Sequence, residues 1–180
     1  KPTSGDFETR EGYKPFIENY FIHLPDAYDA FGDVPATEVY RAAAAHAAAH
    51  LVETKQPISA ESLNPLQMAV ISVIEDARIE ELSIRRFPGL RHTWSVLHSA
   101  TPDMNASMGD YLNRLARALL DPDYKDKDPW IAEGRKLFKA AKDQLDSHKT
   151  SWDIGVQLAH SFMDKKIPFN PRTDVLTAPY

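Results

Sequence analysis

The sequence predicts an all-α fold: a single irregular bundle of five or six helices with an extended C-terminal tail. Apolar residues recur at helical spacing in several segments, and proline or a capping residue separates most of them. One of these segments is rich in alanine, the residue with the highest helix propensity. At most one short strand is expected. The chain has 180 residues, of which 43% are hydrophobic and 26% charged, so it can bury the core of one domain.

Residues 1–34 mix polar, aromatic and proline residues and are expected to form an irregular N-terminal segment that packs on the domain. Within it, Tyr13 to His23 is either a helix or a short extended segment, because periodicity does not decide between them. The helical domain is predicted at residues 35–166. Its first helix should start at Asp33 and Pro35, run through Thr37 to Thr54, and end at Gln56-Pro57.

The segment from Asn64 to Gly89 is the centre of the domain. Asn64 is a good N-cap, Pro65 occupies the first helical position, and Gln67 has capping-box spacing. Pro88-Gly89 ends the helix. Its apolar stripe, which one face must bury, comprises Leu66, Val70, Val73, Ile74 and Ala77.

Shorter helices are predicted in the second half of the chain. Arg91 to Ser99 is expected to be helical, and the next helix is capped by either Asn105 or Ser107 and ends at Asp121-Pro122. Another helix starts at Asp128-Pro129, and its stripe extends to Leu145. The last helix is expected to be capped by Thr150 and Asp153 and to end at residues 165–166; residues 167–180 form the extended tail.

Composition excludes several classes of function. The net charge of -5 argues against broad binding to nucleic acid or to anionic membranes. With no cysteine there is no disulfide and no thiolate metal site, which fits a reducing compartment, and we expect a cytoplasmic protein. Apolar runs are too short for a membrane span, and no export signal is visible. Because the chain starts at a lysine and ends abruptly, we expect it to be part of a longer protein, with the tail leading to a further C-terminal part.

His46 and His50 are four residues apart and project from one helix face, together with Val39 and Ala43. This spacing is typical of a pair of zinc ligands, with a third ligand from another element. Glu75 or Asp76 would supply it, and we take Glu75 as the candidate. In the peptidase signature H-E-x-x-H, the glutamate beside the first histidine activates the metal-bound water. Here that position is Ala47, so zinc is a possible cofactor only, and two hydrogen-bonded core histidines remain the simpler interpretation.

A cluster of charges interrupts the apolar stripe of the central segment. We expect Glu75, Asp76, Arg78 and Glu80 to form a structural ion-pair network towards the first helix or towards a partner. The alternative is a solvated face with local pairs that contribute only about 0.3–0.5 kcal/mol each.

A second basic cluster follows at the end of the same helix. Arg85, Arg86 and Arg91, with His92, surround the segment Phe87-Pro88-Gly89-Leu90 and are candidates for binding an acidic partner surface. The alternative is a helix C-terminus with favourable dipole charges.

Motifs for several chemistries are absent from the sequence. It has no P-loop, no Glu-x-x-His pair for a di-iron centre, and no Gly-x-Ser-x-Gly elbow. It also lacks the D-x-S-x-S run of the metal-dependent adhesion site in von Willebrand A domains. We therefore expect no catalytic residues.

Three segments, in this order and spacing, resemble the NorD/CbbO group, the nitric oxide reductase activation proteins and the Rubisco-activase adaptors. They are Arg41 to Leu51 (RAAAAHAAAHL), Val73 to Glu80 (VIEDARIE) and Arg86 to Arg91 (RFPGLR). The closing Thr177 to Tyr180 is also similar. The resemblance is densest over residues 35–100 and thinner, with a compatible helix order, to residue 180.

The resemblance implies a non-catalytic adaptor. Members of this group carry a helical N-terminal region and a C-terminal von Willebrand A domain, and they work with a hexameric MoxR-type AAA+ ATPase. Together they remodel or activate a target such as nitric oxide reductase, another metalloenzyme or Rubisco. This chain would be the helical region. The alternative is a zincin-like metal-dependent hydrolase, or a degenerate metal-binding relative of one, built on His46, His50 and Glu75.

Overall fold

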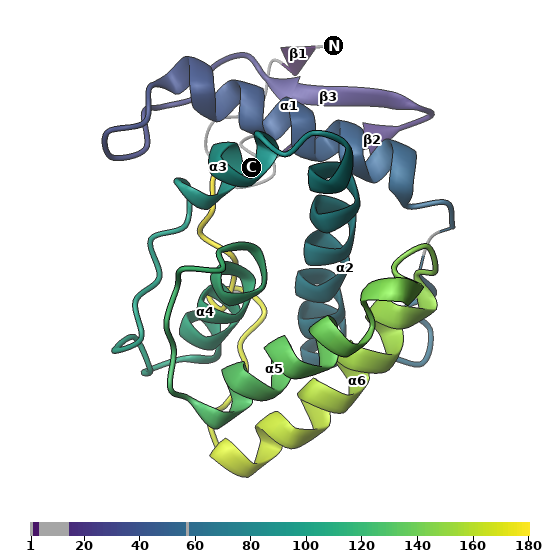
Figure 1. The fold of residues 1–180 in the computed structure, drawn as a ribbon, viewed down its shortest axis with the longest axis vertical. Coiled ribbons are helices and arrows are strands. Elements are labelled where there is room, and N and C mark those ends of the chain that lie inside the picture. Colours follow the sequence, from purple (N-terminus) through teal and green to yellow (C-terminus); the bar gives the residue numbers. More distant parts are fainter. Residues whose placement is uncertain (1, 4–14, 57) are drawn as a thin grey trace.

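A computed structural model describes residues 2–3, 15–56 and 58–180. Within these ranges it contains six α-helices, two short 3-10 helices and a small sheet of three strands, and so confirms a mostly helical bundle (Figure 1). The expectation of at most one strand was wrong, because residues 16–25 form a hairpin. Tyr13 and Lys14, the start of the segment that the sequence left undecided, lie outside the described residues.

The sheet has the order β1-β3-β2. β2 (Phe16–Glu18) pairs antiparallel with β3 (Phe21–Pro25), and β1 (Pro2–Thr3) pairs parallel with β3. Asn19 and Tyr20 form the hairpin turn with φ of 49° and 65°, the positive values that a tight two-residue turn requires. Tyr20 is a bulky residue in that region, which makes the turn a locally strained one.

α1 (Ala36–Glu53) follows from the alanine-rich run and starts after Pro35 without a side-chain cap. Val39, Ala42 and Ala43 are completely buried, and His46 lies on the same face at 8% exposure. The helix lies under the sheet and crosses one end of the central helix (Figure 1). The small alanine side chains let α1 approach its neighbours closely.

α2 (Pro65–Arg86) is the central helix and has the predicted ends. Asn64 and Gln67 form both hydrogen bonds of a capping box, and Phe87 is the C-cap. Its closest neighbour is α6 (Lys149–Phe162), with α4 (Met108–Leu120) next. At Gly155 the approach is so close that an added Cβ would lie 2.7 Å from the Cα of Ile71.

α3 (Leu90–Ser95) connects α2 to the second half of the chain. At the start of α4 the cap is Ser107, which forms a capping box with Asp110, so the structure decides against Asn105. The tail at 167–180 returns along α4. There Asp174 accepts a hydrogen bond from the backbone of Gly109, and Thr177 donates two to Asn113.

α5 (Pro129–Ala140) starts at Asp128 as predicted. The predicted cap of α6 was wrong. α6 begins at Lys149 after His148 with no side-chain cap, because the hydroxyl of Thr150 donates to the carbonyl of Gln144 instead. Leu145 is buried as expected but lies beyond α5, after the 3-10 turn Lys142–Gln144.

The core has two parts. The larger lies between α2, α4, α5 and α6, and the smaller lies between α1, α2 and α3 around the buried Trp94. α2 contributes to both and therefore connects them. Among the described residues, no helix combines the length and hydrophobicity that a membrane crossing requires.

Candidate functional site

Two histidines of α1 and two carboxylates of α2 face each other where the helices cross. His46 and His50 are one turn apart, with ring centroids separated by 4.8 Å. Asp76 and Glu80 are one turn apart on α2 and lie opposite them. The site therefore follows from two i, i+4 pairs, one on each helix.

The donor atoms converge. His50 Nε2 lies 3.2 Å from His46 Nε2 and 3.0 Å from Asp76 Oδ1. His46 Nε2 lies 3.7 Å from the same carboxylate oxygen. Two imidazole nitrogens and one carboxylate oxygen thus lie within 4.8 Å of one another, as the ligands of a single metal ion must.

The outer nitrogen of each imidazole has its own partner. Thr54 donates its hydroxyl hydrogen to Glu75, 2.9 Å away, so its oxygen is left to accept from His50 Nδ1 at 3.2 Å. On the other side, Glu80 Oε1 lies 3.2 Å from His46 Nδ1. That contact is too poorly aligned for a full hydrogen bond and is mainly electrostatic. Both arrangements favour a hydrogen on Nδ1 and leave Nε2 as an acceptor.

The carboxylates change the protonation of the buried histidine. Burial by itself lowers the pKa of His46, but the contact with Glu80 and the charges of Asp76 and Glu80 outweigh it and raise the pKa above 6.5. Nearby, Tyr180 packs on the His46 ring at 4.9 Å and contacts His98 Nε2 through its hydroxyl at 2.6 Å. Burial, followed by the charge of Glu80, raises the pKa of Tyr180 well above 10.

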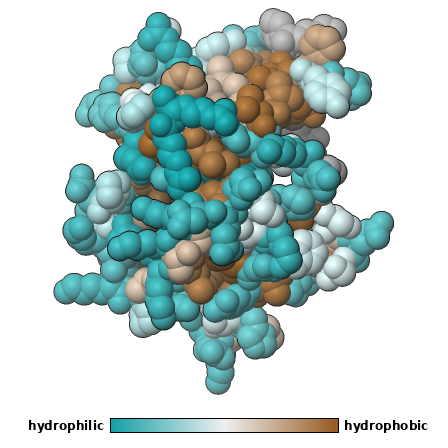
Figure 2. Space-filling view, turned by 45° about the vertical axis from the view of Figure 1, so that its right-hand side comes forward, coloured by the Kyte–Doolittle hydropathy of each residue, from teal (hydrophilic) through white to brown (hydrophobic). Residues whose placement is uncertain are grey.

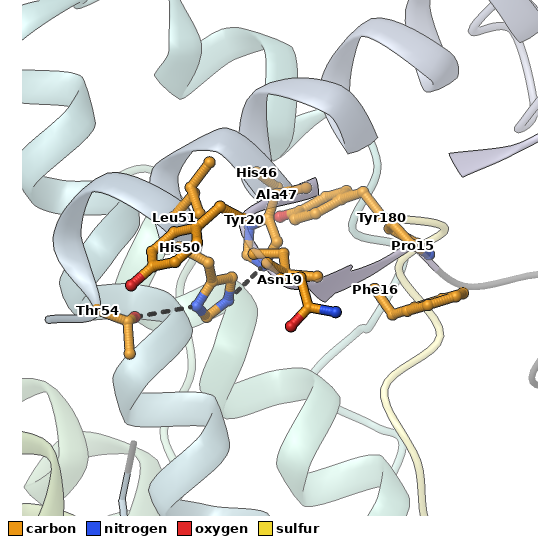
Figure 3. Close-up of a pocket in the computed structure, with 11 residues that line it drawn as sticks. Pro15, Phe16, Asn19, Tyr20, His46, Ala47, His50, Leu51, Thr54 and Tyr180 are labelled. Carbon is orange, nitrogen blue, oxygen red and sulfur yellow. Dashed lines mark hydrogen bonds between the residues drawn. The ribbon is translucent and has the colours of Figure 1, made fainter. Parts of the chain in front are cut away.

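A pocket of about 560 Å³ opens onto the two histidines (Figure 3). His46, Ala47, His50 and Thr54 of α1 form one side of it. The β2–β3 hairpin and the C-terminal residue form the other, with side chains that are mostly apolar or aromatic: Pro15, Phe16, Ile17, Tyr20 and Tyr180. The two imidazoles of the cluster, those of His46 and His50, are therefore accessible from outside through an apolar entrance.

Glu75 is not part of this cluster, contrary to the candidate ligand set. Its two oxygens accept four hydrogen bonds: two from Arg78, one from Thr54 and one from Ser151, at 2.7–2.9 Å. Asp76, the neighbouring residue, lies beside the two histidines where the third ligand was expected. Successive residues of a helix point about 100° apart, so only one of the two carboxylates can face α1 in this way.

Arg78 is the centre of a second, closed network. Its side chain is 1% exposed and pairs with Glu75. It also donates to the backbone carbonyls of Glu53 at the end of α1, and of Leu145 before α6. Hydrogen bonds from Ser151 and Arg78 outweigh the effect of burial and hold the pKa of Glu75 below 4.5. The predicted network of four residues is thus divided: Glu75 and Arg78 connect three helical segments, whereas Asp76 and Glu80 face the histidines.

The three arginines predicted to bind a partner all have partners within the chain. Arg85 contacts Glu81 and the carbonyl of Lys142. Arg86 pairs with Glu53 at 3.0 Å, and Arg91 pairs with Glu81 and donates to the carbonyl of Leu120. Arg85 and Arg86 keep part of their side chains exposed, so a role in docking stays a prediction.

Sequence reasoning missed Thr54, Ser151 and Tyr180. Thr54 had a usable signal, because it lies four residues after His50 on the same helix face. Ser151 and Tyr180 had none, since each reaches its partner across a long sequence separation.

Comparisons with known proteins do not identify the chain: no family model, no curated protein and no solved structure matches it.

Proposed function

We propose that this chain is a non-catalytic adaptor module that docks on a MoxR-type AAA+ ATPase. In this proposal the adaptor works in the cytoplasm and presents a target enzyme, such as nitric oxide reductase or Rubisco, to the ATPase. The resemblance of residues 35–100 to the NorD/CbbO group supports this class of partner. The structural observation that carries a protein-binding role is a group of exposed apolar side chains around the β2–β3 hairpin.

These side chains come from the hairpin and from the end of α1. Tyr20, Phe21 and Val52 are 89%, 65% and 57% exposed, and Phe16, Ile17 and Leu51 are exposed beside them. Hydrophobic surface in this upper part of the molecule is visible in Figure 2. Single exposed apolar residues are ordinary, but a contiguous group of them marks a binding surface. A protein surface with apolar residues of its own is the partner that it fits.

The position beside His46 supports a non-catalytic role. Hydrolases with paired histidines on a helix use a glutamate there as general base, and this chain has Ala47, which lines the pocket with a methyl group. The closed Arg78–Glu75 network connects α2 to the end of α1 and to the segment before α6, as a scaffold for docking requires.

A binding experiment tests the proposal. The chain would be mixed with a purified MoxR-type ATPase, and the affinity measured by biolayer interferometry. We expect a Tyr20→Ser, Phe21→Ser variant to bind roughly tenfold or more weakly, since apolar anchors dominate protein interfaces. Met163→Ser is the matched control, because Met163 is 66% exposed but lies after α6.

The arginines are tested in the same assay. Arg85→Glu, Arg86→Glu is expected to weaken binding through charge and to do so less at high salt. If the ATPase binds neither the wild-type chain nor its variants, the adaptor proposal is wrong. If it binds them all equally, the adaptor role stands but both docking surfaces are wrong.

A second candidate function is a zincin-like metal-dependent hydrolase. The observation that favours it is the convergence of His46, His50 and Asp76, two of which, His46 and His50, line an open pocket. It requires a base that the Ala47 position does not supply. Incubation of the zinc-supplemented chain with an unstructured peptide tests it: cleavage that disappears in His50→Gln would support hydrolysis, and an intact peptide would exclude it for that substrate class.

A further inference from the structure

We propose that His46 Nε2, His50 Nε2 and Asp76 Oδ1 bind one zinc ion, whose fourth position faces the pocket. The inference does not depend on the adaptor role, since an adaptor can function with or without a metal. It also differs from the set expected from sequence, because Asp76 and not Glu75 supplies the oxygen.

The distances fit a tetrahedral ion. Zinc bonds nitrogen and oxygen at about 2.0–2.2 Å, so neighbouring ligand atoms of a tetrahedral site lie about 3.3–3.5 Å apart. The observed separations are 3.0, 3.2 and 3.7 Å. A shift of a few tenths of an ångström would bring all three atoms into position, without a change of rotamer or backbone.

The direction of the lone pairs is the stronger argument. The partners of the two Nδ1 atoms favour hydrogens there, so both Nε2 atoms present lone pairs to each other and to the Asp76 carboxylate. Three acceptors within 4 Å repel one another unless a cation lies between them. That cation is either a proton on one imidazole or a metal ion, and the experiment below decides between them.

The surroundings are those of a metal site. Histidine ligands of zinc usually have a hydrogen-bond partner on their other nitrogen, which orients the ring. Thr54, backed by Glu75, is this partner for His50, and Glu80 lies 3.2 Å from His46 Nδ1 in an electrostatic contact. Two imidazoles and one carboxylate select zinc over magnesium or calcium, which prefer oxygen ligands.

The open side determines what the site can do. His46, His50 and Thr54 line the pocket, so a water molecule or a side chain from outside can reach the fourth position. Figure 3 shows both imidazoles close together on the pocket wall formed by α1. We infer an accessible centre with an exchangeable ligand, in contrast to a closed structural site with four protein ligands.

Metal binding by the purified chain tests the inference. After treatment with a chelator, zinc chloride alone would be titrated by isothermal calorimetry, and cobalt would replace zinc to report geometry by its visible spectrum. We expect one zinc per chain and cobalt bands of a four-coordinate site. The Asp76→Asn variant should bind zinc roughly 100-fold more weakly or not at all. Even mutation of residues that only hydrogen-bond to metal ligands lowers metal affinity about 10–100-fold.

Two further variants complete the design. His50→Gln changes a partly exposed ligand, and circular dichroism would verify that it folds. Asp153→Asn removes an exposed carboxylate of α6 and should leave zinc affinity unchanged. Stoichiometric binding that Asp76→Asn and His50→Gln both retain would overturn the site. So would the absence of zinc binding by the folded wild-type chain, which would leave a proton as the bridging cation.

Discussion

Two polar clusters lie side by side on α2, and they differ in the kinds of group that meet in them. Around Glu75 and Arg78, both carboxylate oxygens accept two hydrogen bonds each, and the guanidinium also donates to two backbone carbonyls. Around Asp76, two imidazole nitrogens and a carboxylate oxygen face one another, and the two histidines also line an open pocket. The first cluster is closed and balanced in charge; the second is open and rich in acceptors.

The difference separates a structural role from a binding role. A buried ion pair whose every group is satisfied has no capacity left for a ligand and acts to hold helices together. For the second cluster we propose a binding role, because two imidazole nitrogens and a carboxylate oxygen converge there and the two histidines line a pocket. Neighbouring residues in the sequence therefore have different functions, and each of the following predictions tests that distinction.

The largest expected effect is on stability, at the closed cluster. Arg78→Met leaves Glu75 buried without its cation, and we expect the free energy of unfolding to fall by about 3–5 kcal/mol. Urea denaturation monitored by circular dichroism measures it. The double variant Glu75→Leu, Arg78→Met should lose less than Arg78→Met alone, because no unpaired charge remains.

Asp76→Asn provides the matched comparison at the open cluster. In the metal-free chain it should cost less than about 1 kcal/mol, because the side chains of Asp76 and His50 are both partly exposed. A loss as large as that of Arg78→Met would mean that both clusters are structural, and the distinction drawn above would fail.

The next effect concerns the helix that completes the closed cluster. Ser151 reaches Glu75 because α6 packs directly on α2 at Gly155, where an added Cβ would lie 2.4–2.9 Å from atoms of Ile71. Gly155→Ala should therefore destabilise the fold by about 1–3 kcal/mol through overpacking. Gly89→Ala is the control, since nothing lies within 4 Å of its added Cβ; equal melting temperatures for the two variants would contradict the prediction.

The remaining prediction is that the stabilities contributed by the two clusters respond to pH in opposite directions. The folded pKa of Glu75 is lowered, so its contribution to stability is present above pH 4.5 and is lost as pH falls through the folded value. The folded pKa of His46 is raised in the metal-free chain, so its contribution is present below pH 6.5 and is lost as pH rises through the folded value.

Unfolding measured between pH 4 and 9 would detect the histidine effect as a difference between the wild type and His46→Gln. The comparison is needed because burial lowers the pKa of His98, which acts in the opposite direction in the same range. We expect the stability advantage of the metal-free wild type over His46→Gln to shrink as pH rises. Saturating zinc should reverse that trend, because the metal binds deprotonated imidazoles. An advantage that does not change with pH would show that His46 is not coupled to Asp76 and Glu80.

The ends of the helices were predictable where local chemistry determines them. The capping box of Asn64 and Gln67, that of Ser107 and Asp110, and the Asp128-Pro129 start are all encoded within four residues. The start of α6 was not predictable, because the hydroxyl of Thr150 donates to the carbonyl of Gln144, outside the helix, and does not cap it. Most of the hairpin at 16–25 lies in a segment that the sequence left open between a helix and an extended conformation, since its strands are too short to show a clear periodicity.

By itself, the sequence determined that His46 and His50 share a helix face, that α2 is a capped helix with charges in its stripe, and that no glutamate stands beside His46. Each of these features depends only on which residues occupy nearby positions of one helix. The tertiary structure alone decided that Asp76 faces the histidines and that Glu75 accepts from Thr54 and Ser151. The physical reason is rotation: adjacent residues on a helix differ by about 100° in direction, and only the packing of α2 against α1 and α6 sets which direction meets which neighbour.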